Sequence, residues 1–545
     1  MKNPVLFFTY ILIIGLGFTA CNGIKFSHNL TSRLNDDQKL ELALLQIARR
    51  RFTVPVQDYY EEVYFNTVYS GRYNDIGDRS SLFVEASPFN SGSAANANVI
   101  QKQLLEVVNQ VFNDLRKYYA LYSFYGGDKR FLQAYDEMLA FIQRADALVA
   151  PAVFVQAITD SLGFIHDQHF IIASQDEQYY SQSKRRRPNV LVWLEKLFLY
   201  PLLDGGWFAE IGEDQYIIDQ QKNQELFKHI YPVLGDDGSI FWQVFFFLSA
   251  EEAEQPQVFQ LLLNKVRNNS VVLANLVPVV WPVSLNTSAE GSDFTFKEYK
   301  DTNDVYWLRA DHFKIGDDIW NFEEQKNTHA EAEEVLRFRR TALNFKSAQV
   351  AVLDLSRNTG GTNSIPYGWL RYYAYKRPHK ILNENDDAFM PVYFANHNPS
   401  VVDNINIALP VVMLDTDYPL ALVLQSKNTG SAGESFLFQL REHSNALFIG
   451  EPSFGALLAG NPLDRNYLYL YANLQITIPG LGLFYKKGFE ECGFLPDFFV
   501  GLDNAEITLN NFLRRYQVDF VKEELRKAIL LVQKECFNFL GERND

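Results

Sequence analysis

Apolar residues recur at helical spacing in the first third of the chain and again at its end. From about residue 36 to 180 the pattern is mainly helical, with steps of three and four residues among Leu104, Leu105, Val108, Val111, Phe112 and Leu115. Near the end, residues 518–540 predict an amphipathic helix whose apolar face is formed by Val521, Leu525, Ala528, Val532 and Cys536. Both patterns predict helices that pack against a core.

The period shortens between residues 186 and 300. Residues 207–211 and 215–218 predict a β-hairpin that is closed by the polar segment 212–214. Further short apolar runs follow this hairpin. They indicate a small α+β module.

Strands and helices alternate from residue 306 onward. Short apolar runs at 350–354, 411–414 and 447–449 predict strands, and residues 432–443 predict a helix between the last two. The order strand, loop, helix, strand is typical of an α/β core with largely parallel strands.

The size and composition of the chain agree with several globular domains. At 545 residues the chain is too long for one hydrophobic core. Hydrophobic residues make up 47% of the sequence and aromatic residues 15%, which excludes a disordered chain. The net charge of −16 disfavours nucleic acid as a partner, and we interpret the basic run at 184–187 as a solvated loop.

The N-terminus has the layout of a secretory signal peptide. Lys2 precedes the apolar run 5–16, and small residues then lead to Cys21. The segment 18–21, Phe-Thr-Ala-Cys, resembles a bacterial lipobox, so we expect cleavage before Cys21 and a lipid on that cysteine. A non-lipidated signal peptide or a membrane anchor stays open as the alternative. No other segment has the ~20 uninterrupted apolar residues of a membrane-spanning helix.

These patterns divide the chain into five segments. They are a lipoprotein signal peptide at 1–20, a mainly helical domain at 21–185, the small α+β module at 186–300, the α/β core at 301–505 and a C-terminal helical segment at 506–545.

Two small-residue segments in the core carry candidate chemistry. Residues 428–436, Asn-Thr-Gly-Ser-Ala-Gly-Glu-Ser-Phe, place Ser431 where an apolar helix begins. About 75 residues earlier, the apolar strand at 350–354 leads into the loop that holds Gly360 and Gly361. A serine at a helix start is usually only a cap. Beside a glycine loop whose N–H groups can face an anion, it is also a candidate nucleophile next to an oxyanion hole.

A nucleophilic serine needs a base, and His169 is the best placed of the nine histidines. It precedes a β-like apolar run, although a histidine in such a place is most often structural. His166 and His169 have HxxH spacing but lack the glutamate of the zinc-protease helix, so no metal site is expected. Glu490 and Glu491 lie in a Gly- and Pro-containing loop, where a carboxylate could orient a base or simply be exposed.

Four segments occur in the order and at about the spacing of motifs in the C-terminal-processing and tricorn-like serine peptidases, family S41. The chain resembles this family through segments similar to its Asp-Gly-His-Thr, Asp-Leu-Arg-x-Asn-x-Gly-Gly, Ser-Ala-x-Glu with Gly-Glu-x-Thr-x-Gly, and Glu-Gly-x-Gly-x-x-Pro-Asp motifs. Here these segments are 167–170, 354–361, 430–436 with 449–455, and 488–497. They span about residues 160 to 500.

The resemblance also implies which groups act. C-terminal-processing members use a lysine about 25 residues after the serine, but that position is Ala456 here. Tricorn-like members use a histidine and a glutamate instead. The resemblance therefore implies Ser431 as nucleophile, His169 as general base and acid, and Glu490 as the supporting carboxylate. It further implies an oxyanion hole made by the N–H groups of Gly360 or Gly361 and of Ala432.

The resemblance implies a ClpP/crotonase-like α/β core that cleaves a peptide or protein substrate through an acyl-enzyme without a metal or other cofactor. The module at 186–300 is a candidate PDZ-like domain, although it has no clear Gly-Leu-Gly-Phe-type loop. We expect an exported protein that is lipid-anchored in the cell envelope, in the periplasm or at the cell surface. The sequence departs from the family at Ser356, Phe170 and Glu491, which motivates an alternative: an inactive binding or scaffolding lipoprotein.

Overall fold

The computed structural model describes most of the chain in separate ranges. They are residues 34–52, 99–119, 121–122, 125–144, 149–167, 169–174, 189–194, 197–203, 206–211, 214–218, 222–249, 257–265, 268–278, 294–314, 330–362, 364–374, 419–443, 446–456, 459–460, 465–469, 474–479, 481–482 and 493–541. Several sequence-based predictions lie outside these residues. They are the signal peptide with Cys21, the basic run at 184–187, the strand at 411–414, and the loop residues Glu490 and Glu491.

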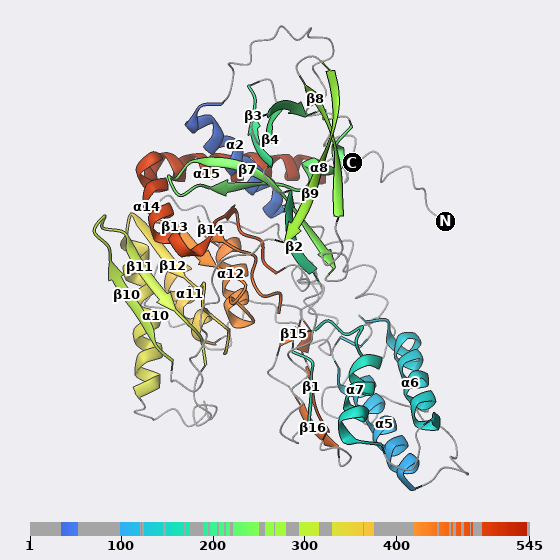
Figure 1. The fold of residues 1–545 in the computed structure, drawn as a ribbon. Helices are drawn as coiled ribbons and strands as arrows, with labels where there is room; N and C mark the ends of the chain where they lie inside the picture. Colours follow the sequence, from blue (N-terminus) through green and yellow to red (C-terminus); the bar gives the residue numbers. More distant parts are fainter. Residues whose placement is uncertain are drawn as a thin grey trace.

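A mainly parallel sheet forms the centre of the α/β core (Figure 1). In spatial order its strands are β10 (Phe296–Lys300), β11 (Tyr306–Ala310), β12 (Val350–Asp354), β13 (Leu420–Gln425), β14 (Ala446–Gly450) and β19 (Phe498–Phe499). Only the edge strand β10 is antiparallel to its neighbour. The strands expected at 350–354 and 447–449 are confirmed. Strand β13 was not predicted, although its residues 420–424 form an apolar run like those at 350–354 and 447–449.

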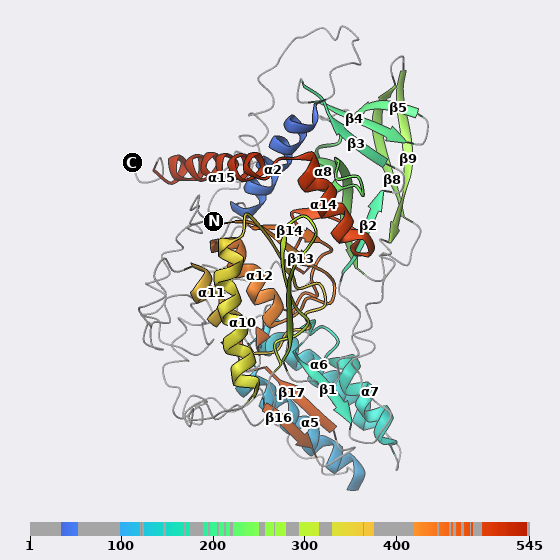
Figure 2. The same ribbon diagram turned by 90° about the vertical axis from the view of Figure 1, so that its left-hand side faces the viewer.

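Alternate residues of each core strand enter different hydrophobic clusters, as the two-residue period of a strand requires. Val350 and Val352 of β12 face the cluster that includes helices α2 (Asp36–Phe52), α14 (Ala505–Arg515) and α15 (Val518–Gly541). Ala351 and Leu353 face α10 (Ala330–Ser347), α11 (Ser364–Ala374) and α12 (Ala432–His443). The sheet therefore lies between two helical layers (Figures 1 and 2).

The two helices predicted at 432–443 and 518–540 are confirmed as α12 and α15. On α15 the expected apolar face is buried at Val521, Leu525, Ala528 and Val532. Helix α2 packs along α15, in the same cluster. Among the described residues, no helix is long and apolar enough to cross a membrane.

The segment between residues 189 and 278 is mostly antiparallel sheet. Its strands are β2 (Asn189–Leu194), β3 (Leu197–Pro201), β4 (Trp207–Ile211), β5 (Asp214–Ile218), β6 (Ile230–Leu234), β7 (Ile240–Ser249), β8 (Gln257–Lys265) and β9 (Asn268–Pro278), with the short helix α8 (Gln224–Phe227). The predicted hairpin is confirmed by the pairing of β4 with β5. Strand β6 also pairs with β19, so this sheet continues into the core sheet.

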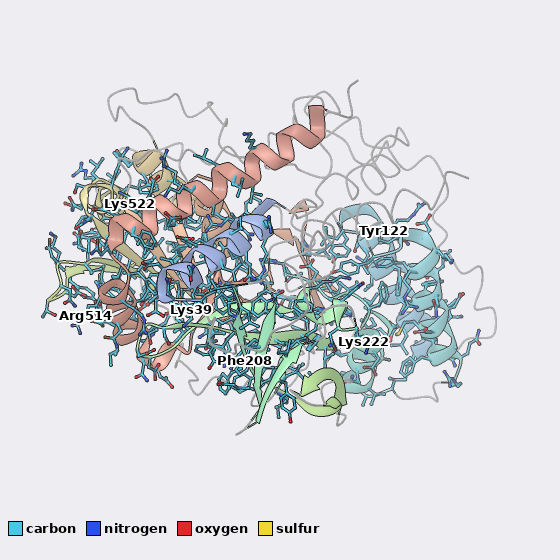
Figure 3. The ribbon with its side chains drawn as sticks, turned by 90° about the horizontal axis from the view of Figure 1, so that it is seen from above. Lys39, Tyr122, Phe208, Lys222, Arg514 and Lys522 are labelled. Atoms are coloured by element: carbon cyan, nitrogen blue, oxygen red, sulfur yellow. The ribbon has the colours of Figure 1, made fainter. Side chains whose placement is uncertain are left out.

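A separate helical unit lies below the core in Figure 1. Helices α5 (Val99–Tyr118), α6 (Gly127–Arg144) and α7 (Pro151–Ser161) share one hydrophobic cluster with β1 (Ile171–Ser174) and β17 (Leu474–Ile478). Strand β17 lies between β1 and β16 (Arg465–Tyr469) in a small sheet, and β15 (Ala459–Gly460) pairs with β18 (Leu481–Gly482) nearby in the chain. In the view from above, Tyr122 of this unit lies on the opposite side from Arg514 and Lys522 (Figure 3).

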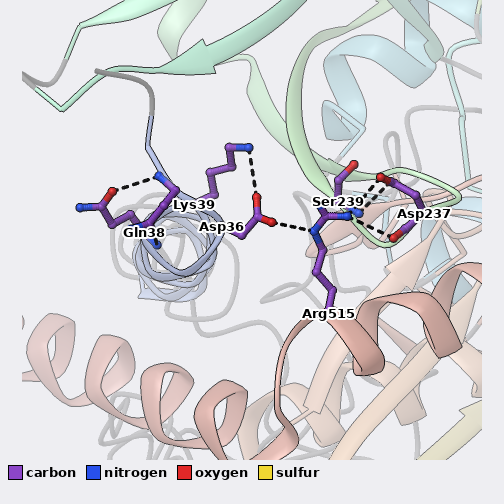
Figure 4. A network of polar contacts seen from close by, with 7 residues as sticks. Asp36, Gln38, Lys39, Asp237, Ser239 and Arg515 are labelled. Carbon is purple, nitrogen blue, oxygen red and sulfur yellow. Dashed lines mark hydrogen bonds and ion pairs between the residues drawn. The ribbon is translucent and has the colours of Figure 1, made fainter. Parts of the chain in front are cut away.

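Charged side chains join helix α2 to the core and to the β-rich segment. Arg51 forms a buried ion pair with Asp497, with 2.6 Å between Nη2 and Oδ2. At the other end of the helix, Arg515 Nε lies 2.9 Å from Asp36 Oδ2, and its Nη1 lies 3.1 Å from Asp237 Oδ2 (Figure 4). This second network is partly exposed. Helix α2 therefore packs with the core. The predicted helical domain at 21–185 had placed it with α5 to α7.

Candidate active site

The carboxyl ends of β12 and β13 bring two loops together. The two strands are parallel neighbours, so the chain leaves both at the same edge of the sheet. There the Gly430 N–H donates to the Asn358 carbonyl at 2.9 Å, and Thr429 Oγ1 donates to the Leu355 carbonyl at 2.8 Å. These bonds place the glycine loop of residues 358–361 directly beside the turn that ends in Ser431.

Ser431 has an unusual backbone conformation at this turn. Its φ is +50°, in the left-handed region that residues with a Cβ rarely adopt, at a typical cost of about 1–3 kcal/mol. It directly precedes α12, and its N–H donates to the Glu434 carboxylate at 3.0 Å. Its hydroxyl points to a histidine rather than capping the helix. The serine is therefore held in a strained turn with its side chain partly exposed.

His169 is that histidine. Its Nε2 lies 3.2 Å from Ser431 Oγ, although the two residues are 262 positions apart in the sequence. His169 is largely buried and lies two residues before the start of β1, so the helical unit supplies the imidazole and the core supplies the hydroxyl. The structure thus brings together the two residues that the sequence analysis paired.

Asp167 lies next to His169 and is completely buried. Its Oδ1 accepts the His169 N–H at 2.8 Å and lies 3.8 Å from the ring atom Nδ1. Its Oδ2 accepts the hydroxyl of Tyr119 at 3.0 Å. In the sequence, Asp167 stands only within a motif, and no role was predicted for it. The signal was the Asp-x-His spacing, in which an aspartate can bond the N–H two residues ahead.

Glu434 was also missed as a site residue. The side chain is completely buried, and its carboxylate accepts the N–H groups of Ser431, Gly455 at 2.7 Å and Ala456 at 2.8 Å, as well as the Ser453 hydroxyl. Burial raises the pKa of Glu434, and these hydrogen bonds oppose that shift. Its sequence signal was Ser431 followed three residues later by a glutamate, the spacing of a capping box.

The glycine loop packs closely against the serine. Gly360 has φ +95°, and a Cβ at this position would lie 2.7 Å from Ser431 Cβ and 3.2 Å from the Ala432 nitrogen. The Gly360 N–H donates to Asn358 Oδ1 at 3.0 Å. Among the described residues, neither the Gly361 N–H nor the Ala432 N–H donates a hydrogen bond, so both can donate to a bound group.

The departures from the family motifs have plain local roles. Ser356 donates both its N–H and its hydroxyl to Asp354, at 3.0 and 2.6 Å. Phe170 is buried, and its ring centroid lies 5.5 Å from that of Tyr119. Ala456 stands where C-terminal-processing members have a lysine, and its N–H donates to the Glu434 carboxylate. The described residues hold no cluster of three or more His, Cys, Asp or Glu that could bind a metal.

A serine at a helix start, a histidine within hydrogen-bond range and two available N–H groups form the arrangement that serine hydrolases use. Residues 318–482 match the sequence profile of Peptidase family S41, so the resemblance to this family is confirmed. The matched range contains Ser431 and the glycine loop, whereas His169 precedes it. The match supports the class of serine peptidases, whose substrates are peptides or proteins.

Several solved structures are similar to this chain. Mature CPAF complexed with lactacystin is 13% identical with a TM-score of 0.36, and the match covers 79% of this chain and 99% of that one. The photosystem II D1 C-terminal processing protease is 12% identical with a TM-score of 0.30, over 75% and 94% of the chains. The tricorn protease is 13% identical with a TM-score of 0.34, over 79% and 37%. None of the curated proteins matches this sequence.

Proposed function

We propose that this protein is an exported serine endopeptidase or processing peptidase of the tricorn-like branch, which cleaves peptide bonds through an acyl-enzyme. The observation that carries the proposal is the 3.2 Å contact between Ser431 Oγ and His169 Nε2. A hydroxyl that meets an imidazole at this distance can lose its proton as it attacks. The family match of residues 318–482 supports the same chemistry.

In the first step Ser431 Oγ bonds to the substrate carbonyl carbon while its proton passes to His169 Nε2. The carbonyl electron pair moves onto oxygen and forms the tetrahedral oxyanion. His169 then gives the proton to the leaving amine as the C–N bond breaks, and the acyl-enzyme remains. A water molecule repeats the sequence, with His169 again as the base, and releases the acid and Ser431.

The N–H groups of Gly361 and Ala432 are the proposed donors to the oxyanion. Of the two glycines expected for this role, Gly360 already donates to Asn358, so Gly361 is the better candidate. The Ala432 nitrogen belongs to the first residue of α12, where the helix dipole favours negative charge. Two preorganised donors would stabilise the developing charge without a metal or other cofactor.

The remaining parts of the proposal come from the sequence. Glu490 is the proposed supporting carboxylate, and the segment at 186–300 is proposed to correspond to the PDZ-like domain of some relatives. Cys21 is the proposed site of a lipid anchor that would hold the mature protein in the cell envelope. The substrate would then be an exported peptide or protein.

Fluorophosphonate labelling tests the proposal, because this probe reacts only with an activated serine. The chain from residue 22 onward is compared with folded Ser431→Ala and His169→Ala variants. His166→Ala is the matched control, since His166 is an exposed histidine in the same segment. We expect labelling of the wild type and of the control, and none of the two site variants. A well-folded wild type that is not labelled would support the binding lipoprotein instead.

The pH dependence of labelling gives a second check. A protonated imidazole cannot accept the Ser431 proton, so the rate should fall as the pH falls through the pKa of His169. A rate that is constant from about pH 5 to 8 would argue against His169 as the base.

A further inference from the structure

Asp167 is a buried carboxylate for which the proposed mechanism has no use so far. It lies between α7 and β1 and is held from two sides, by the Tyr119 hydroxyl on Oδ2 and by the His169 N–H on Oδ1. Tyr119 follows the last residue of α5 and is itself buried, with its ring near Phe170. The carboxylate is therefore anchored in the core of the helical unit.

A turn of this kind does not need a charge. An asparagine can accept the same N–H two residues ahead, since both side chains form this turn. Burying an ionised carboxylate is costly unless opposite charge or several hydrogen bonds compensate it. The presence of an aspartate here is better explained if its charge is used.

The geometry indicates where the charge acts. The two ring nitrogens of His169 face different groups, with Nε2 3.2 Å from Ser431 Oγ and Nδ1 3.8 Å from Asp167 Oδ1. For Nε2 to accept the serine proton, the hydrogen of the neutral ring must be on Nδ1. A carboxylate oxygen beside Nδ1 favours that tautomer, and contacts of this type often shorten when substrate binds.

We propose that Asp167 is a positioning residue of this site: it fixes the main chain of His169, selects the ring tautomer, and stabilises the imidazolium that forms when Ser431 loses its proton. This inference rests on the proposed function. No covalent bond to Asp167 forms or breaks, and its charge does not change during the cycle. It would act together with Glu490 or in its place.

On the same segment, the exposed His166 directly precedes Asp167. Tyr119 comes from the end of α5, and Ser431 comes from the core. Arg116 on α5 and Asp128 on α6 form an ion pair with each other, at 3.0 Å, and Tyr122 also donates to Asp128. Asp128 is therefore a carboxylate of the same helical unit that bonds an arginine and a tyrosine rather than the His169 segment.

The test is an NMR titration of the histidine rings in the protein, with the His169 signal identified by its absence in His169→Ala. The variants are Asp167→Asn, which keeps the shape and removes the charge, and Asp128→Asn as the matched control. Removing a nearby negative charge makes the imidazolium less stable. We therefore expect Asp167→Asn to lower the titration midpoint of His169 by about one pH unit or more, and Asp128→Asn to leave it unchanged.

Fluorophosphonate labelling of the same variants supplies a second readout. We expect Asp167→Asn to slow labelling roughly tenfold or more and to move its acid limb to lower pH. An unchanged midpoint in Asp167→Asn, or an equal shift in Asp128→Asn, would overturn the inference. If Asp167→Asn lowers the His169 midpoint but the wild type is never labelled, the inference about Asp167 holds and the proposed function is overturned.

Discussion

Glu434 connects the serine turn to the loop at 453–456, and replacing it with glutamine tests this connection. Its Oε2 accepts the N–H groups of Ser431 and Ala456, and its Oε1 accepts the Gly455 N–H and the Ser453 hydroxyl. A carboxyl group, charged or neutral, can serve all four partners. The Ser453 hydroxyl can rotate to accept a hydrogen bond instead of donating one, but the three backbone N–H groups can only donate.

Glutamine has one acceptor oxygen and one NH₂ group. In its best orientation the oxygen keeps Ser431 and Ala456, the NH₂ donates to the Ser453 hydroxyl, and the Gly455 N–H loses its acceptor. One buried N–H without a partner costs about 1–3 kcal/mol. We therefore expect Glu434→Gln to destabilise the local structure by that amount.

Hydrogen exchange measured by mass spectrometry on peptides covering the serine turn and residues 453–456 is the appropriate assay. The expected loss is local to the serine turn, so exchange of these peptides reports it more directly than unfolding of the whole chain does. A local loss of about 1–3 kcal/mol predicts exchange that is roughly 5- to 150-fold faster. Fluorophosphonate labelling of Ser431 should fall as well, because the turn that presents the hydroxyl opens more often.

Glu506→Gln is the matched control. Glu506 also lies in the first turn of a helix, α14, but its side chain is exposed. Its replacement should change exchange and labelling little. If Glu434→Gln exchanges no faster than this control, the carboxylate does not hold the serine turn and the reasoning is wrong.

Three further predictions concern stability and the glycine loop. Arg51→Ala leaves the Asp497 charge buried without its partner and should reduce stability by about 3–5 kcal/mol. Arg515→Ala, in a partly exposed network, should reduce stability by about 1 kcal/mol or less. Equal shifts of the thermal unfolding midpoint in the two variants would contradict this. Gly360→Ala would force a Cβ against Ser431 and should abolish labelling, whereas Gly127→Ala, also at positive φ but with open space, should retain it. Because burial raises the pKa of Glu434, its stabilising contribution is complete below about pH 4.3 and declines as the pH rises through the raised value. The difference in unfolding midpoint between wild type and Glu434→Gln should therefore narrow with rising pH, and a widening difference would refute the sign.

Local patterns were sufficient for several elements of the fold. Helix α12 begins and ends where the sequence predicts, at 432 and 443, because small residues precede a run with helical spacing. Helix α15 and the hairpin of β4 and β5 follow in the same way from a 3.6-residue and a two-residue period. These features depend on contacts between residues that are close in the chain.

The joining of the β-rich segment to the core was not predictable in this way. Strand β6 meets β19 through a single register pair, Phe499 with Val233, and no periodicity specifies which edge strands of two sheets meet. Helix α2 was grouped with its sequence neighbours, but it packs on α15 at the other end of the chain. Such pairings depend on which apolar faces remain to be buried once each unit has formed.

The sequence by itself determined the candidate nucleophile and the glycine loop, because each lies in a short segment whose composition reflects a local backbone requirement. It pointed to His169 through the resemblance of the segment 167–170 to a family motif. Only the tertiary structure decided that His169 Nε2 meets Ser431 Oγ. It also showed that Asp167 accepts the His169 N–H and that Glu434 accepts the Ser431 N–H. The reason is physical. A strained turn or a helix start is specified by neighbouring residues, whereas a hydrogen bond between residues 262 positions apart exists only after two separately packed units have come together.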